Sequence, residues 1–385
     1  MGGIVLIYFD NSATTKPYKE VVDSFVKVTS EYFGNPSSLH KLGGEAEKLL
    51  SKARKQVSDL LGVKPTEVIF TSGGTESNNL AIKGAAIQHR NRGTHIITTA
   101  IEHASVKETF LQLEELGFQV TYIPVDEKGR VKVKDIENAI SDETILVSVM
   151  HVNNEVGTIQ PIKEIGNLLK NYPKIIFHVD NIQGVGKVPL DLNKSSIDLC
   201  SYSAHKFHGL KGTGMLYIRD GVKISPLLTG GSQEKKHRSG TENVAGMVAL
   251  ARALRMSLER EKTHLQNLLR VKETIINGIG KIEGVTIHTP ASGSAPHIIN
   301  FSIKGFKAEV FVHALEEKDI YVSTTSACSS KKQASSSTLI AMGVAEEMAK
   351  SAVRISLSYE NTVEEALFAV NAIKETINNL KEVMN

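Results

Sequence analysis

The sequence predicts an α/β protein with a large domain, built on a mainly parallel seven-stranded sheet, and a smaller α+β domain. Between about residues 50 and 220, short apolar runs alternate with segments of helical spacing. Composition then changes at one long helical pattern, residues 243–280, and the 385 residues leave room for two domains. Strands that alternate with helices form parallel sheets with right-handed crossovers and helices on both faces.

Seven runs carry the strand pattern of the large domain, being short, rich in Val and Ile, and mostly followed by small or polar residues. In chain order they are EVIFTSG (67–73), HIITTAIEH (95–103), QVTYIPVD (119–126), TILVSVMHVN (144–153), IIFHVDN (175–181), IDLCSYSAH (197–205) and GMLYIR (214–219). Helical spacing fills many of the intervals, at 76–89, 105–117, 132–140 and 162–172. No internal repeat interrupts this alternation.

The smaller domain follows the long helical pattern. We expect strands at GVTIHT (284–289), HIINFSI (297–303), IYVST (320–324) and AVRISLS (352–358), with helices at 307–319, from about 337, and at the C-terminal end. The boundary is expected inside the long helix, near residue 255. This gives a large domain of residues 14–255 and a small domain of residues 256–385 together with 1–13.

Charge and composition exclude several classes of partner. The net charge is only +3, from 45 basic and 42 acidic residues, and aromatic residues make up 5% with no Trp. We therefore expect neither nucleic acid nor a membrane surface as the main partner. Two cysteines argue for a reducing compartment, and the apolar run at 4–9 is too short for a signal peptide or a membrane span. The expected location is the cytoplasm.

Polar residues directly follow five of the apolar runs. In open parallel sheets, ligands bind beyond the carboxyl ends of the strands, so these residues are expected to meet at one edge. They lie at 72–75, 102–103, 151–155, 180–183 and 203–206. The pattern indicates a binding site.

The first of these segments, SGGTESNN, predicts an anion site. Two glycines allow a tight turn that exposes backbone N–H groups, and a helix then opens at about Thr75. A helix N-terminus after such a turn binds phosphate. The Gly-Lys-Ser/Thr end of a Walker sequence is missing, and an ordinary strand–turn–helix connection is the alternative.

Two further segments carry groups of opposite charge. Asp180 ends a strongly apolar strand, where a carboxylate is either a cap or loop-ordering residue, or the partner of a protonated ring nitrogen in a cofactor. Lys206 follows an apolar strand and precedes three glycines, which suits a lysine that forms a Schiff base with an aldehyde cofactor. His205 and His208 have no acidic or cysteine partner at ligand spacing, so we expect no metal site.

The two cysteines lie in different sequence surroundings. Cys328 lies in TTSACSSKKQASSSTL (324–339), a stretch of small polar residues with the composition of a flexible loop. A linker does not need a thiol, so Cys328 is either incidental or the reason for the loop. Cys200 lies within an apolar strand and is interpreted as a buried core residue.

Taken together, these motifs resemble the class V branch of fold-type I pyridoxal 5′-phosphate (PLP) enzymes, and within it the cysteine desulfurases of the NifS/IscS type. The resemblance covers essentially the whole chain. Its motifs, in order, are YFDNSATT, SGGTESNN, EHASV, MHVNNEVGTIQP, HVDNIQG, SAHKFHGLKGTG, RSGTEN, SACSS and VRISLS. The resemblance implies a fold-type I PLP-dependent transferase.

The resemblance also implies roles for single residues around the cofactor. Lys206 would bind PLP covalently, and Asp180 would keep the pyridine nitrogen protonated. His103 would stack on the ring and move protons, and Gln183 would hydrogen-bond the phenolic oxygen. The residues implied to hold the phosphate are Gly74, Thr75, Ser203, His205 and, across a homodimer interface, Thr241.

For the substrate, the resemblance implies L-cysteine. Arg354 would bind its carboxylate with the help of Asn154, although the neighbouring Asn153 fits the motif as well. Cys328 would attack the substrate sulfur, and the products would be L-alanine and a persulfide on Cys328. The implied role is sulfur supply for iron–sulfur cluster assembly or for other acceptors.

The implied acceptor is an iron–sulfur scaffold protein of the U type, although the KKQASSST stretch after SACSS is less typical of the family and leaves the acceptor open. Two alternatives remain. One is a selenocysteine lyase or another β-eliminating enzyme. The other is a protein of this fold that has lost catalysis and acts as an interaction partner; the retention of Lys206, Asp180 and Cys328 argues against it.

Overall fold

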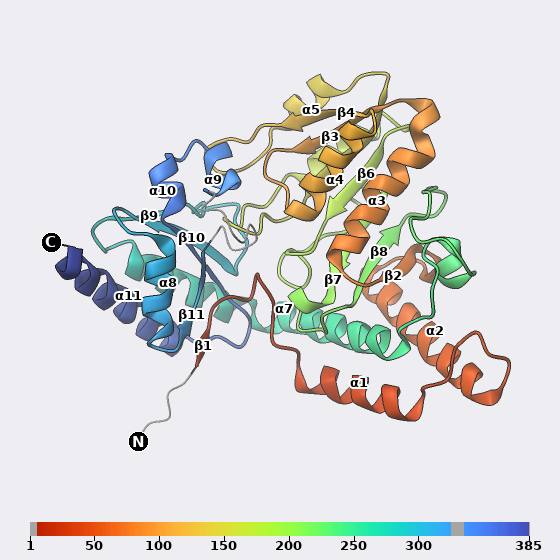
Figure 1. Cartoon of the computed structure of the whole chain (residues 1–385), viewed down its shortest axis with the longest axis horizontal. Helices are drawn as coiled ribbons and strands as arrows, with labels where there is room; N and C mark the ends of the chain where they lie inside the picture. The colour runs from red at the N-terminus through yellow and green to blue at the C-terminus, as the bar shows by residue number, and fades with distance from the viewer. Residues whose placement is uncertain (1–5, 325–334, 385) are drawn as a thin grey trace.

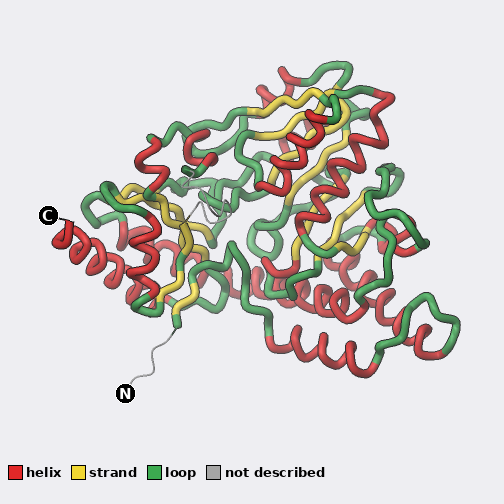
Figure 2. Tube along the Cα trace, in the orientation of Figure 1, coloured by secondary structure: helices red, strands yellow, loops and turns green. Residues whose placement is uncertain are grey.

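The computed structural model describes residues 6–324 and 335–384. Figure 1 shows a large sheet flanked by helices and, beside it, a smaller group of strands and helices that holds the C-terminus. The strands of the large sheet run between layers of helices in Figure 2. The long helix α7 (Val244–Ile279) extends from one group to the other.

The large sheet has seven strands in the order β2-β8-β7-β6-β5-β3-β4. Their bounds are β2 Val68–Thr71, β3 His95–Thr99, β4 Gln119–Ile123, β5 Thr144–Met150, β6 Ile176–Asp180, β7 Leu199–Ser203 and β8 Gly214–Ile218. Only β8 runs opposite to the other six strands. The prediction of a mainly parallel seven-stranded sheet is confirmed, and each predicted run contains one strand.

Helices cover the two faces of this sheet with separate cores. Successive residues of β2 point to opposite faces, Val68 and Phe70 to one and Ile69 to the other. On the face of Ile69, the sheet packs against α3 (Gly74–His89) and α4 (Ala104–Glu115). The opposite face packs against α2 (Lys41–Leu61), α5 (Val133–Ala139), α6 (Ile162–Leu169) and the first part of α7.

Two N-terminal helices were not predicted. Helix α1 (Lys19–Glu31) and α2 both pack on α7. The buried face of α2 has helical spacing but consists of small residues alternating with larger ones: Ala46, Leu50, Ala53 and Val57. Helix α1 buries only Val21 and Val28, so its pattern in the sequence is weak.

The smaller group of elements surrounds a four-stranded antiparallel sheet in the order β12-β13-β10-β9. Its strands are β9 Val285–Ile287, β10 Ile298–Ile303, β12 Ser323–Thr324 and β13 Ala352–Ser356, and its helices are α8 Ala308–Glu316, α9 Ser337–Ala341, α10 Glu346–Lys350 and α11 Val363–Met384. The predicted strand at 320–324 is divided. Its first half, β11 (Ile320–Tyr321), pairs with the N-terminal β1 (Ile7–Tyr8), and its second half, β12, pairs with β13.

Helix α7 contributes to two cores. Its buried residues from Met247 to Leu254 belong to the core of the large sheet, and those from Leu268 belong to the core of the small sheet. Short 3-10 turns complete the chain: η1 Pro65–Glu67, η2 Arg90–Arg92, η3 Ala204–Lys206 and η4 Gln233–Lys236. The division of the chain near residue 255 stays a prediction. None of the helices in the described ranges is long and apolar enough to cross a membrane.

Candidate active site

A cavity of about 220 Å³ lies at the carboxyl ends of the parallel strands. Its lining residues are Gly74, Thr75, His103, Ser105, Met150, Val152, Asn154, Asp180, Ile182, Gln183, Ser203, His205 and Lys206. All five polar segments that follow the predicted strands contribute to it. The sheet topology explains why, because β2, β3, β5, β6 and β7 all run in the same direction.

One end of the cavity is the N-terminus of α3. Gly73 has a φ of 152°, which favours glycine, and a Cβ on Gly74 would lie 2.3 Å from Cδ1 of Ile182 and 3.3 Å from Cβ of Ser203. The chain therefore turns here with no side chain between the cavity and the backbone. The first N–H groups of a helix have no intrahelical acceptor, so this end suits an anion.

Asp180 lies in the cavity wall and is only 4% exposed. Its Oδ2 accepts a hydrogen bond from Nδ2 of Asn78 (2.8 Å), and its Oδ1 accepts one from the Ile182 amide (3.0 Å). Burial raises the pKa of Asp180, while the Ile182 amide, His103, Asn78 and Lys206 oppose that rise. A buried carboxylate that faces a cavity is best stabilised by a cation placed against it.

Lys206 ends the 3-10 turn η3, directly after β7. Its Nζ donates to the carbonyl oxygens of Ser12 (2.5 Å) and Ala13 (2.9 Å). The N-terminal segment therefore lies beside the lysine. Nε2 of Gln183 donates to the same Ser12 oxygen at 3.0 Å, which joins two of the predicted cofactor residues through one backbone group.

His103 is the N-cap of α4. Its Nδ1 accepts a hydrogen bond from the Ser105 amide at 3.1 Å, and Oγ of Ser105 lies 2.9 Å from the same nitrogen. Since a backbone N–H can only donate, Nδ1 carries no proton and the neutral ring carries it on Nε2. Burial lowers the pKa of His103, although Asp180 opposes this. The ring is therefore held in one tautomer at the cavity wall.

His205 also lines the cavity. Its Nδ1 is 3.1 Å from Oγ1 of Thr14. Burial, followed by the charges of Lys206 and Lys211, lowers the pKa of His205 to about 4. The ring is neutral near pH 7, so it acts on an anion as a hydrogen-bonding group.

Arg354 on β13 approaches the cavity from the small sheet. Its Nη1 donates to the backbone oxygen of Asn154 and its Nη2 pairs with Oδ1 of Asp10, both at 3.0 Å. Its buried Nε has no hydrogen-bond partner among the described residues. The guanidinium therefore retains donor capacity next to the cavity, although it does not line it.

The two neighbouring asparagines have different surroundings. Both follow β5, Asn153 in an irregular segment and Asn154 in a turn. Asn153 is fully buried: its Nδ2 donates to the Ile101 carbonyl, and its Oδ1 accepts from the amides of Glu155 and Val156. Asn154 lines the cavity. The structure thus brings Asn154, and not Asn153, to the candidate site.

Sequence reasoning did not single out three residues that organise the site. Asn78 holds Asp180, Ser105 contacts both Asn78 and His103, and Asp10 pairs with Arg354. Each lies inside a quoted motif: SGGTESNN, EHASV or YFDNSATT. Of the three, Asn78 could have been found from the sequence, because a polar residue four positions after Gly74 lies on the same helix face.

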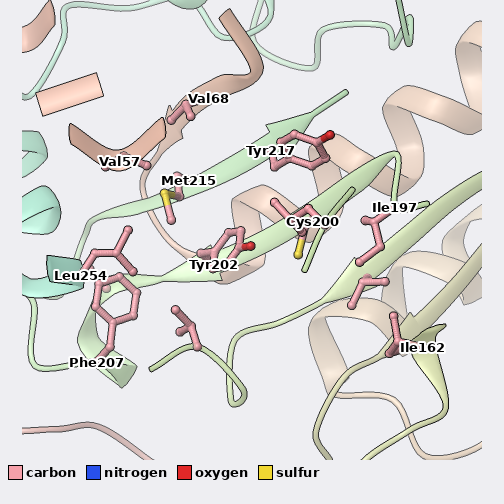
Figure 3. Packing of buried hydrophobic residues seen from close by; sticks show 14 of the residues in the cluster. Val57, Val68, Ile162, Ile197, Cys200, Tyr202, Phe207, Met215, Tyr217 and Leu254 are labelled. Carbon is pink, nitrogen blue, oxygen red and sulfur yellow. The ribbon is translucent and has the colours of Figure 1, made fainter. Parts of the chain in front are cut away.

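One predicted phosphate-binding residue lies apart from the cavity. Thr241 is exposed in the loop before α7 and does not line the cavity. Cys328 lies outside the described residues. Cys200 is fully buried, and Figure 3 shows it packed among core side chains such as Ile197 and Tyr202. Burial raises the pKa of its thiol, so the interpretation as a core residue is confirmed. No cluster of three or more metal-ligating side chains occurs in the described part of the chain.

The donor set fits PLP. An anion-binding helix end, a buried carboxylate and a primary amine surround one cavity, and these match the phosphate, the pyridinium nitrogen and the aldehyde of this cofactor. The fold and site thus define a PLP-type enzyme. The model of the aminotransferase class-V family matches residues 7–367, and the chain belongs to this family.

Similar proteins of known type show which kind of class-V enzyme this chain resembles. The chain is 50% identical over 380 residues to a NifS/IcsS protein homolog of Lactobacillus delbrueckii subsp. bulgaricus, covering 98% of this chain and 99% of that one. It is 44% identical to the cysteine desulfurase IscS of Methanosarcina thermophila, with 98% and 93% covered. A solved NifS-like protein superposes with a TM-score of 0.92 at 40% identity, covering 97% of this chain and all of that one.

Proposed function

We propose that the protein is a PLP-dependent cysteine desulfurase. It converts L-cysteine and the thiol of Cys328 into L-alanine and a persulfide on Cys328. The carbon–sulfur bond of the substrate breaks, a sulfur–sulfur bond forms, and the substrate carbon receives a proton. The observation that carries the proposal is the meeting of Lys206, Asp180 and the α3 N-terminus in one cavity, in a chain similar to cysteine desulfurases over nearly its whole length.

Each end of the cavity would hold one part of PLP. Gly74, Thr75, Ser203 and His205 would bind the phosphate, and Asp180 the ring nitrogen. Gln183 and His103 would contact the ring, and Lys206 would bind the aldehyde carbon. When bound, PLP supplies an electron sink for charge that develops on the substrate Cα.

The remaining polar groups suit an amino acid substrate. The guanidinium of Arg354, which already contacts the backbone of Asn154, would bind the carboxylate in a two-pronged contact. Asn154, whose backbone oxygen already accepts from Arg354, would contact the same group. His103, with its proton on Nε2, would exchange protons with the substrate.

We further propose a homodimer in which the exposed Thr241 of one protomer reaches the phosphate of the other. The sulfur carried by Cys328 would pass to an iron–sulfur scaffold of the U type, or to another acceptor. These partners follow from the family resemblance of the RSGTEN and SACSS motifs.

Mass spectrometry after brief exposure of the PLP-loaded protein to L-cysteine tests the reaction and the nucleophile together. We expect an added sulfur on the peptide that contains Cys328, with none on the peptide that contains Cys200, because burial keeps the Cys200 thiol protonated. Cys328→Ala should retain the visible absorbance of bound PLP and form neither persulfide nor alanine. Sulfur on Cys200 alone, or alanine formed at the parent rate by Cys328→Ala, would contradict the proposal.

A further inference from the structure

A carboxylate lies in the first turn of α3, next to the end of the cavity that suits an anion. Glu76 directly follows Thr75, which lines the cavity. Its Oε2 accepts a hydrogen bond from the Ser72 amide at 2.8 Å, which holds the turn before the helix. The negative charge of Glu76 therefore lies at the same positively polarised helix end that an anion would use. A second negative group there is repelled unless Glu76 is neutralised.

Arg238 supplies the opposite charge. Its Nε donates to Oε1 of Glu76 at 2.8 Å, and its Nη2 lies 3.4 Å from Oε2. The side chains of Arg238 and Glu76 are 24% and 18% exposed, so water screens the pair only in part. Burial would raise the pKa of Glu76, but the hydrogen bonds from Arg238 and Ser72 bring it below its ordinary value. Glu76 is thus ionised near pH 7, and Arg238 balances its charge.

The loop that carries Arg238 is held in place by a second ion pair. Residues 234–236 have φ values of 44°, 55° and 67°, a left-handed conformation that side chains rarely adopt. The buried carboxylate of Glu234 accepts hydrogen bonds from Nη2 of Arg54 (2.6 Å), Nη1 of Arg54 (2.8 Å) and the Phe70 amide (2.9 Å). Glu234, the other carboxylate that acts on Arg238, therefore has a partner of its own. Arg238 is left to neutralise Glu76.

Arg238 lies beside the cavity without lining it. Together with Glu76 and Thr75 it lines a separate hollow of about 470 Å³. Thr75 is the residue that this hollow shares with the cavity of the candidate active site. Arg238 is therefore placed to affect an anion in the cavity through the charge of Glu76, and not by contact with the anion.

We propose that Arg238 is a positioning residue for anion binding: by neutralising Glu76, it allows the N-terminus of α3 to accept the phosphate of PLP. Without Arg238, the unpaired carboxylate in the first turn of α3 repels the phosphate. The inference rests on the proposed role of the cavity as a PLP site.

Four variants test this balance of charges. Arg238→Gln removes the positive charge, whereas Glu76→Gln removes the negative charge and keeps an acceptor for the Ser72 amide. The double variant removes both charges and is neutral again, like the parent pair. Arg260→Gln is the matched control, because Arg260 is 29% exposed, pairs with Glu360 at 3.0 Å and does not line the cavity.

The measurement is the dissociation constant of PLP and of pyridoxal, obtained by absorbance titration of the PLP-free full-length proteins. Pyridoxal has the same aldehyde and lacks the phosphate, so the comparison isolates the phosphate. We expect Arg238→Gln to raise the dissociation constant of PLP about three- to tenfold and to leave that of pyridoxal unchanged. Adding Glu76→Gln should restore PLP binding to within about twofold of the parent, because the repulsive charge is gone. Arg260→Gln should change neither constant.

An unchanged PLP constant in folded Arg238→Gln would overturn the proposal, as would a double variant that binds PLP as weakly as Arg238→Gln. Equal weakening of PLP and pyridoxal would also overturn it, since that is the result of a purely structural role.

Inorganic phosphate gives a second measurement that requires no PLP. The phosphate concentration for a half-maximal rise in melting temperature should be highest in Arg238→Gln and return to the parent value in the double variant. A parent protein that binds phosphate but not PLP would contradict the proposed function, while the order of the variants would still decide the role of Arg238.

Discussion

Glu102 illustrates how burial sets the charge of a single side chain next to the site. It lies between β3 and α4, where its Oε1 accepts hydrogen bonds from Thr99 Oγ1 (2.8 Å) and the Met150 amide (2.9 Å). Its Oε2 has no partner among the described residues. Burial raises the pKa of Glu102 from 4.5 to about 8, and the nearby Asp180 adds to the rise. The carboxyl group is therefore protonated at neutral pH.

The protonation of Glu102 predicts how the free energy of unfolding depends on pH. A group whose pKa is higher in the folded state contributes stability that is complete below pH 4.5 and is lost as pH rises through about 8. Glu102→Gln, which stays neutral, avoids the loss. We expect the free energy of unfolding of the variant, relative to the parent, to increase steadily with pH across this window.

Urea denaturation at several pH values measures the difference, with both proteins free of PLP. The control is the exposed Glu127→Gln, which should follow the parent at every pH. If the parent and Glu102→Gln keep a constant difference from acid to mildly alkaline pH, Glu102 is not buried in its protonated form.

At the scale of single elements, two glycines inside helices have opposite surroundings. In α6, a Cβ on Gly166 would lie 1.8 Å from the carbonyl oxygen of Ser195. In α2, a Cβ on Gly44 would meet no atom within 4 Å. Gly166 therefore allows α6 to approach the chain before β7, whereas Gly44 has no such packing role.

Alanine substitutions should separate these cases. Gly44→Ala should raise the free energy of unfolding by about 0.5–1 kcal/mol, because alanine has the better helix propensity. Gly166→Ala should lower it by several times this amount, roughly 2–4 kcal/mol, since a backbone atom has to move. Chemical denaturation of the two variants beside the parent checks both signs; a stabilised Gly166→Ala would show that α6 does not pack this closely.

At the scale of the whole molecule, α7 connects the two cores. Leu254 is buried in the core of the large sheet and Leu268 in that of the small sheet, fourteen positions further along one continuous helix. The two groups meet beside the cavity, because Arg354 of β13 donates to the backbone of Asn154, and Asn154 lines the same cavity as Lys206 and Asp180. The N-terminal segment also joins them, since Asp10 pairs with Arg354 and Ser12 accepts from Lys206.

This arrangement predicts coupled unfolding. Leu254→Ala and Leu268→Ala should each cost about 2–5 kcal/mol, and each should accelerate amide hydrogen exchange in β6 and in β10. The exposed Leu367→Ala on α11 is the control and should change little. Faster exchange confined to β10 and β13 in Leu268→Ala would instead show two independent units and would support the predicted division near residue 255.

Much of the architecture could be predicted because strands of a buried parallel sheet are continuous apolar runs, as in β5 and β6. Ligands bind beyond the carboxyl ends of parallel strands, and nine of the predicted residues at these ends do line the cavity. The sequence pattern did not predict an element that buries few side chains, or the division of one apolar run between two sheets. Helix α1 buries two side chains, and the run at 320–324 serves two sheets.

The sequence alone determined the alternation of strands and helices, the polar residues at the strand ends and the family to which they belong. These are local properties: side-chain periodicity and the order of residue types along the chain. Only the tertiary structure decided contacts between distant segments. It placed Asn154 rather than Asn153 at the cavity, Asp10 in contact with Arg354, and Lys187 in contact with the backbone oxygen of Lys206. Such contacts depend on which distant segments the fold brings together, and the periodicity of side chains along the sequence does not encode this.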